Sequence, residues 1–341
     1  MRTPHVVVEW REQRLVATDA ATGRRHAVTV EALRVLDLAG TPATIADLAA
    51  RAGVEPAVAV ALVAAELLVA PDRVPERHHW SATELVVQRT TRTVRPVAER
   101  EATRELMEPP RKDATGPLWE LPVADPADDP PFSRVLAERR SCRAFGSDPI
   151  DAPTLGRFLE MSCAVQQDAR KFGSGVSWRP HPSGGGRHPL ETYVYPLNVT
   201  GLERVVYRYD PFLRCLEQVD KADGSFFEMV RELPEHHELM EGDPAVLLVT
   251  TAVFARTMWK YDNGGLLIVH QDAGALYQTF YLVAAALGLG GCVIGGGSEA
   301  LIARALDIDP LREGHVGTFL LGVPADDRYR DPLRDVFAEA R

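Results

Sequence analysis

The sequence predicts an α+β fold, because strand-like and helix-like segments are mixed without the regular alternation of a doubly wound parallel sheet. Runs rich in β-branched and aromatic residues predict strands at residues 192–199, 245–253 and 317–323. Apolar residues at helical spacing predict helices from Phe132, at 153–165 and at 272–287. We therefore expect a mixed or antiparallel central sheet flanked by helices.

Length and composition set the class of protein. The 341 residues, of which 45% are hydrophobic and 25% charged, are typical of a soluble protein of about two domains. The net charge of −10 argues against a nucleic-acid binder, because neutralising phosphates needs a basic surface. The start of the chain is unlike a signal peptide, and the apolar run at 57–70 is interrupted by Glu66 and too short to span a bilayer. We expect a cytoplasmic protein that does not enter a membrane.

The four cysteines are far apart in the sequence and show no CxxC spacing, so neither a metal site nor a disulfide framework is predicted. They are expected to be ordinary buried thiols.

Residues 1–75 are predicted to form a small N-terminal domain. Residues 5–29 alternate short apolar runs with turns, which favours a small antiparallel sheet, and helices are expected at 31–39, 44–52 and 55–69, with Thr44 as an N-cap and Gly53 as a stop. This order resembles a winged helix. Residues 55–69 contain no Lys or Arg, so DNA binding is not expected. Docking of a peptide or partner, and a packing or dimerisation role, both remain open.

Residues 76–130 are predicted to be a linker or arm, because they are rich in Pro and charge and have few apolar periods. The segment 83–94 within it could form a strand or a helix. The second predicted domain covers residues 131–341.

Two segments of this second domain have a composition suited to binding a phosphate-bearing ligand. The run RRSCR at 139–143 offers guanidinium groups and a hydroxyl to a phosphate, although a solvated charge cluster explains it as well. The glycines in PSGGGRHPLETYVYPLNV at 182–199 would let the backbone approach a ligand, although a flexible loop is the alternative. The segment ALGLGGCVIGGG at 286–297 could hold a flat ring or simply pack a helix against a strand.

Lys260 and Tyr261 are neighbours in MWKYDNGG, residues 258–265. Adjacent side chains of a strand point to opposite faces, so both could serve one substrate only where the backbone turns. Asn263-Gly264-Gly265 makes a turn plausible. The residues by themselves favour a packed tyrosine and a solvated lysine over a catalytic pair.

Taken together and in order, these four motifs resemble the nitroreductase-like flavoenzymes, and in particular the SagB-type dehydrogenases, over roughly residues 131–325. The resemblance implies bound FMN at the interface of a homodimer, and Lys260 and Tyr261 as the catalytic Lys-Tyr motif. It implies that the phosphate and ribityl chain contact Arg139, Arg140, Ser141 and Arg143. It implies that the flavin lies beside Ser183, Gly184, Gly185, Gly295 and Gly296.

The activity that this resemblance implies is oxidation of peptide thiazolines or oxazolines to azoles, in which a protein base takes the Cα proton and the flavin takes a hydride. An azoline-containing precursor peptide and the cyclodehydratase of the same pathway are the expected partners. An NAD(P)H-dependent nitro or quinone reductase and a non-catalytic scaffold are the alternatives. His181, His188 and His270 are left outside the catalytic set.

Two departures from the family's pattern bear on the substrate. Asp272-Ala273-Gly274-Ala275 stands where relatives commonly read Glu-Ala-Gly-His, and Gln278-Thr279 stands where they read Gln-Asn. These changes alter the expected wall of the site but leave the proposed base in place.

Overall fold

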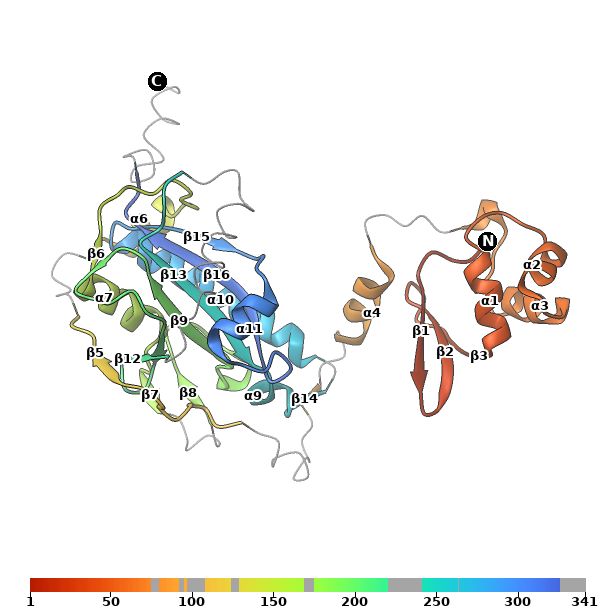
Figure 1. Ribbon diagram of the computed structural model, residues 1–341, viewed down its shortest axis with the longest axis horizontal. Helices are drawn as coiled ribbons and strands as arrows, with labels where there is room; N and C mark the ends of the chain where they lie inside the picture. Colours follow the sequence, from red (N-terminus) through yellow and green to blue (C-terminus); the bar gives the residue numbers. More distant parts are fainter. Residues whose placement is uncertain are drawn as a thin grey trace, which may run out of the picture. The chain divides into compact units, whose positions relative to one another are not determined.

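The computed structural model describes residues 1–74, 80–91, 95–96, 108–123, 129–168, 175–219, 241–262 and 264–325. The chain divides into two compact units, Met1–Val94 and Arg95–Arg341 (Figure 1). The predicted domain boundary at residue 75 and much of the predicted linker lie outside the described residues. The predicted domain limits therefore stay predictions.

The N-terminal unit consists of a small sheet followed by helices. Its antiparallel strands, in the order β1-β2-β3, are β1 (Val6–Arg11), β2 (Arg14–Asp19) and β3 (Arg25–Val28). Its main helices are α1 (Val30–Leu38), α2 (Ile45–Ala52) and α3 (Pro56–Ala64). Thr44 Oγ1 accepts the Asp47 N–H at 3.1 Å, and Gly53 ends α2 in the left-handed region, as predicted. The small sheet is confirmed, whereas the winged-helix interpretation stays a prediction.

The last helix of this unit is shorter than predicted. The sequence suggested a helix over 55–69, but α3 ends at Ala64 and the chain turns at Glu66, whose φ is 57°. The turn brings Leu67 and Leu68 into the core, where they are 1% and 3% exposed. Burial of two leucines therefore outweighs continued helix. The helix η1 (Pro71–Arg73) follows, and α4 (Ala82–Thr91) shows that the ambiguous segment at 83–94 is helical over its described part.

The second unit is built on an antiparallel sheet with the order β15-β16-β13-β9-β11-β12-β5 among the described residues. Its strands are β5 (Leu118–Glu120), β9 (Leu190–Pro196), β11 (Tyr207–Asp210), β12 (Cys215–Gln218), β13 (Val246–Val253), β15 (Gly290–Ile294) and β16 (Glu313–Gly322). Short pairs lie outside it: β6 (Ile150–Asp151) with β10 (Val199–Thr200), β7 (Gln167–Asp168) with β8 (Ser177–Trp178), and β4 (Arg95–Pro96) with β14 (Tyr261–Asp262). The predicted α+β class is confirmed.

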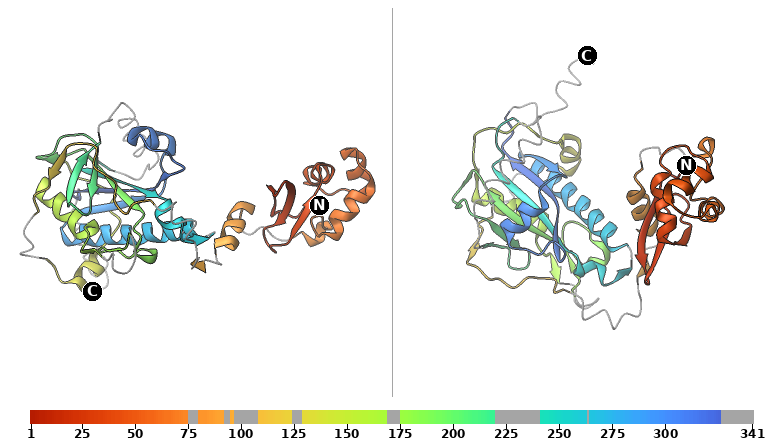
Figure 2. Two further views of the ribbon diagram at one scale, coloured as in Figure 1. Left: turned by 90° about the horizontal axis from the view of Figure 1, so that it is seen from below. Right: turned by 45° about the vertical axis from the view of Figure 1, so that its right-hand side comes forward.

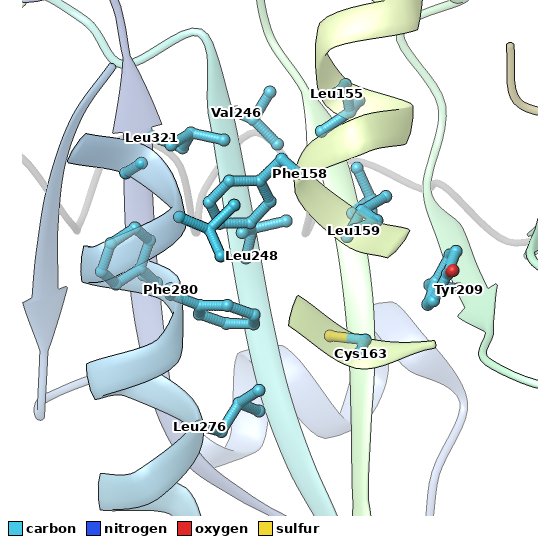
Figure 3. Packing of buried hydrophobic residues seen from close by; sticks show 14 of the residues in the cluster. Leu155, Phe158, Leu159, Cys163, Tyr209, Val246, Leu248, Leu276, Phe280 and Leu321 are labelled. Carbon is cyan, nitrogen blue, oxygen red and sulfur yellow. The ribbon is translucent and has the colours of Figure 1, made fainter. Parts of the chain in front are cut away.

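Helices cover both faces of this sheet, so the inner strand β13 is buried along its whole length. The helices are α6 (Phe132–Glu138), α7 (Ala152–Cys163), α9 (Ala255–Met258), α10 (Gly265–Ala286) and α11 (Glu299–Leu306), and α10 runs along one face (Figure 2). On that face Phe158 of α7 and Phe280 of α10 pack with their ring centroids 5.3 Å apart, next to Leu248 of β13 (Figure 3). On the other face Ile302 of α11 joins a second cluster.

Helix α10 begins seven residues before the predicted start at residue 272. Residues 265–271, Gly-Leu-Leu-Ile-Val-His-Gln, contain no proline, and the buried Val269 continues the apolar face that Ala273 and Leu276 extend. The consequence for the site is large, because the glycines at 264 and 265 begin a helix instead of forming a free turn.

Part of the predicted arm packs on the sheet. The side chains of Asp210 and Glu217, both buried, accept hydrogen bonds from Arg111 Nε at 2.7 Å and from the Gly116 N–H at 3.1 Å. Strand β5 then pairs with β12. Residues 108–120 are therefore held in the second unit by buried carboxylates.

The four cysteines are free and buried. Of the helices in the described ranges, none is both long and apolar enough to cross a bilayer. The cytoplasmic location stays a prediction.

Candidate functional site

The glycine-rich loop at Ser183–Arg187 lies between β8 and β9, with Gly185 exposed and with Gly184 and Gly186 partly buried. Gly185 and Gly186 both have φ of 66°, a conformation that favours glycine. A Cβ atom on Gly184 would lie 2.3 Å from Ile268 Cγ2, and one on Gly186 would lie 2.9 Å from Val176 Cγ1. The structure therefore requires glycine here for both conformation and space.

Asp272 of α10 holds this loop in place. Its Oδ2 accepts a hydrogen bond from Ser183 Oγ at 2.5 Å, and its Oδ1 accepts the Gly184 N–H at 2.9 Å. Ser183 Oγ in turn accepts the His188 N–H at 2.9 Å. The carboxyl group is buried, which raises its pKa, while the bonds from Ser183 and Gly184 oppose that rise.

Lys260 and Tyr261 both reach Gly185. A Cβ atom on Gly185 would lie 2.6 Å from Tyr261 Oη and 3.3 Å from Lys260 Nζ, and Nζ lies 5.5 Å from the centre of the tyrosine ring. They share one space because the chain turns at Trp259 and Lys260, directly after α9, before Tyr261 begins β14. The turn was predicted at 263–265, after the pair. Asn263 lies outside the described residues, and Gly265 begins α10.

The surroundings favour the uncharged form of both side chains. Burial lowers the pKa of Lys260, and the positive charge of Arg187 lowers it further. Burial raises the pKa of Tyr261; Arg187 opposes this rise and the charge of Asp272 adds to it. The Arg187 guanidinium lies 4.8 Å from the ring centre of Trp259, the residue before Lys260.

The arginine-rich segment at 139–143 follows α6 and contacts the other half of α10. Ser141 Oγ lies 3.1 Å from Tyr281 Oη, and the Arg139 guanidinium lies 5.2 Å from the centre of the same ring. Arg143 is exposed, and the Cys142 N–H donates to the Gly291 carbonyl oxygen at 2.9 Å. Arg140 donates to the Ala137 and Arg139 carbonyl oxygens. A pocket of about 340 Å³ beside the segment is lined by Arg134, Arg140, Cys142, Tyr281 and Gly290 among others.

The second glycine-rich segment divides into a packed part and an open part. Gly290 and Gly291 belong to β15, and a Cβ atom on Gly290 would lie 2.6 Å from Cys142 Sγ. Gly295 and Gly296 follow the strand and are exposed, with no described atom within 4 Å of a Cβ placed on either. The described contacts do not bring these two glycines to the Lys-Tyr pair.

Helix α10 connects the two groups that do form clusters. Ile268 and Asp272 contact the glycine-rich loop, and Tyr281 contacts the arginine-rich segment. Asp272 and Tyr281 are nine positions apart, and at 1.5 Å per residue this places them about 13 Å apart along the helix. One end offers cationic and hydroxyl groups and the other offers a glycine cradle, so the arrangement suits a long ligand with a phosphate at one end and a flat ring at the other.

Sequence reasoning assigned no role in the site to Asp272, Arg187, Trp259 or Tyr281. Asp272 was noted only as a departure, because its partners Ser183 and Gly184 are 89 and 88 residues away. Arg187 lay inside a quoted motif, but its proximity to Trp259 depends on the fold. No sequence signal identifies Tyr281.

The histidines near the loop are buried beneath it. His188 Nε2 lies 3.0 Å from the Ser177 carbonyl oxygen, and His181 Nδ1 lies 3.1 Å from that of Ser162. Burial and the charge of Arg179 lower the pKa of His181 to about 4 and that of His188 to about 2, so both rings are neutral near pH 7. Within the described ranges, no group of three or more His, Cys, Asp or Glu side chains could hold a metal ion.

Comparison with known proteins gives a family match and several relatives. The model of the nitroreductase family matches residues 136–323. MJ1384 of Methanocaldococcus jannaschii, a candidate nitroreductase, is 31% identical over 175 residues, which cover 51% of this chain and 83% of that protein.

Two relatives are peptide-processing proteins. The microcin B17-processing protein McbC of Escherichia coli is 29% identical over 135 residues, covering 38% of this chain and 49% of McbC. The trifolitoxin-processing protein TfxB of Rhizobium leguminosarum bv. trifolii is 28% identical over 190 residues, covering 52% of this chain and 50% of TfxB. This chain thus aligns with about half the length of each processing protein.

Two solved structures resemble this chain in backbone fold with low TM-scores. A chain of the E. coli microcin synthetase McbBCD complex with truncated pro-MccB17 bound has a TM-score of 0.48 and 20% identity, covering 74% of this chain and all of that one (100%). A candidate nitroreductase in complex with FMN from Desulfovibrio desulfuricans has a TM-score of 0.37 and 19% identity, covering 59% and 90%. Scores this low carry no argument about the activity of this chain.

Proposed function

This chain belongs to the nitroreductase family, and we propose that it is an FMN-dependent dehydrogenase that oxidises thiazolines or oxazolines in peptides to the corresponding azoles. The observation that carries the proposal is that Lys260 and Tyr261 both reach Gly185, within a loop suited to hold a flat ring. A flavin reductase fed by NAD(P)H needs no such pair of proton-handling groups. The two peptide-processing relatives favour a peptide substrate.

FMN fits the donors and the space that the chain provides. The phosphate and ribityl chain would be held by Arg139, Ser141 and Arg143, with Arg140 beside them. The ring would lie against Ser183, Gly184 and Gly185, and the open space at Gly295 and Gly296 leaves room for part of the ligand. Bound FMN supplies the acceptor for the hydride that leaves the azoline.

Lys260 is the general base of the proposed reaction. A lysine can accept a proton only when it is neutral, and burial and Arg187 both favour the neutral form. Lys260 Nζ would take the Cα proton of the azoline, and the substrate loses that proton and a hydride, two hydrogens in all. Because Lys260 and Tyr261 both contact the loop, the proton acceptor would be next to the ring that accepts the hydride.

Tyr261 is a hydrogen-bond donor in this scheme. Its pKa is raised, so the phenol keeps its proton at neutral pH. The negative charge that develops on the substrate as the Cα proton leaves would be stabilised by the Tyr261 O–H. The two residues therefore have different proposed roles: Lys260 accepts a proton, and Tyr261 donates a hydrogen bond.

We also propose that the protein acts as a homodimer on a precursor peptide, alongside the cyclodehydratase that makes the azoline. The N-terminal unit would help to engage the peptide or this partner enzyme. This part of the proposal is motivated by exposed apolar side chains of the N-terminal unit: Trp10 is 71% exposed and Val60 is 51% exposed.

Product analysis tests the activity. Holoprotein incubated in air with an azoline-containing peptide should produce a peptide lighter by two hydrogens, as measured by mass spectrometry, and NADPH should not be needed. The relationship to MJ1384 favours a nitro or quinone reductase as the second candidate. Rapid oxidation of NADPH with no change in the peptide would establish that candidate, and inactivity with both substrates would favour a scaffold.

A further inference from the structure

Asp272 is a buried carboxylate whose hydrogen-bond donors among the described residues are neutral. It is 4% exposed, and both of its oxygens accept hydrogen bonds from the glycine-rich loop, from Ser183 Oγ and the Gly184 N–H. No ion pair joins it to a described cation. A buried charge without a cationic partner costs folding free energy, so stability alone does not account for a carboxylate at this position.

The loop is confined on its other side as well. Gly184 rests on Ile268, one helical turn before Asp272, and Gly185 faces Tyr261 Oη and Lys260 Nζ. The glycine backbone is thus held between α10 and the Lys-Tyr pair. A small displacement of the loop would change the space in which a ring can lie in front of the pair.

We infer that Asp272 is a positioning residue, which anchors Ser183 and Gly184 to α10 and thereby sets the position of the flavin ring relative to Lys260 and Tyr261. The inference rests on the proposed function for its link to turnover, but its link to FMN binding needs only the cofactor. Both oxygens of Asp272 accept hydrogen bonds from the loop, whereas Lys260 Nζ and Tyr261 Oη face Gly185. The departure from Glu to Asp at this position shortens the anchor by one methylene group.

The test uses Asp272→Asn, Ser183→Ala and the double variant, with Asp148→Asn as the control because Asp148 is exposed and lies outside the loop. Asparagine keeps the size of aspartate but cannot accept hydrogen bonds at both terminal atoms. We would measure the FMN retained by the purified holoprotein on serial dilution, the position of its visible absorption band, and kcat and KM with an azoline peptide.

We expect Asp272→Asn to weaken FMN retention at least tenfold, to shift the absorption band and to lower kcat more than it raises KM. Ser183→Ala should weaken FMN retention several-fold. The double variant should retain FMN as well as Asp272→Asn does, because both changes act on the same hydrogen bond, from Ser183 Oγ to Asp272 Oδ2. The control should match the unaltered protein. Unchanged retention and spectrum in Asp272→Asn, or losses that simply add in the double variant, would overturn the inference.

Two further outcomes separate this inference from the proposed function. If Asp272→Asn does not fold, Ser183→Ala is compared with Ser183→Thr, which keeps the hydroxyl and should keep FMN; equal losses in both would overturn the inference. Altered FMN retention in a protein that does not oxidise azolines would remove the proposed substrate and leave Asp272 as a positioning residue for the flavin.

Discussion

The two glycine-rich segments of the second unit look alike in sequence but differ in structure. In the first, at 184–186, added Cβ atoms would meet Ile268, Tyr261 or Val176 within 3 Å. In the second, Gly295 and Gly296 have no described atom within 4 Å of such a position. The first segment is therefore glycine because the protein itself leaves no space. The second is exposed and leaves open space, in which the proposed ligand could lie.

Removing the amine beside the packed segment should have the largest effect. Lys260→Ala should lower kcat by about 10²- to 10⁴-fold, the usual contribution of a general base, while FMN stays bound. Tyr261→Phe should cost less, because it removes a hydrogen bond and leaves the base. Steady-state kinetics on flavin-loaded variants measures both. Wild-type turnover by Lys260→Ala would remove the catalytic assignment.

A methyl group in the packed segment should be the next most damaging change. Gly185→Ala places a Cβ 2.6 Å from Tyr261 Oη at a φ of 66°, and should lower the free energy of unfolding by about 1–3 kcal/mol. FMN retention should fall with it, because the loop or the pair must move. Urea denaturation of the holoprotein gives the first quantity. No change in either quantity would show that the loop is loosely held.

The pH dependence of turnover should follow Lys260. A base is active when deprotonated, so kcat should rise with pH through the pKa of Lys260, and the midpoint should lie below the ordinary lysine value because burial and Arg187 lower it. Burial raises the pKa of Tyr261, and the charge of Arg187 opposes this rise.

Arg187→Gln tests the cause of that midpoint. Removing the positive charge should move the rising limb of the profile to higher pH, as seen in a pH series of kcat. A midpoint that stays in place, or moves to lower pH, would mean that Arg187 does not act on Lys260.

The open segment should tolerate a methyl group as far as stability is concerned. Gly295→Ala should change the free energy of unfolding by no more than about 0.5 kcal/mol, yet weaken FMN retention if the ring lies there. Gly274→Ala is a matched control, because Gly274 is exposed on α10 with no described atom near its Cβ position and should gain about 0.5–1 kcal/mol. Equal FMN retention in both variants would move Gly295 out of the flavin site.

The comparison also shows how far sequence reasoning reached. It identified the α+β fold class, and the family resemblance carried by four ordered motifs grouped Lys260, Tyr261 and Ser183–Gly185 as one predicted site, which the residues by themselves did not. It placed the turn after the pair, because the apolar residues that extend α10 back to Gly265 become helical only when packed. It assigned no role to Asp272, because an anchor formed across 89 residues leaves no local pattern.

The most direct test of the central claim is anaerobic mixing of the flavin-loaded protein with an azoline peptide, while the visible absorbance of the oxidised flavin is followed. The account predicts bleaching in one turnover, with loss of two hydrogens from the peptide and at least a hundredfold slower bleaching in Lys260→Ala, in line with the contribution of a general base. A flavin that the peptide leaves oxidised, and that NADPH bleaches at the same rate in both proteins, would contradict it.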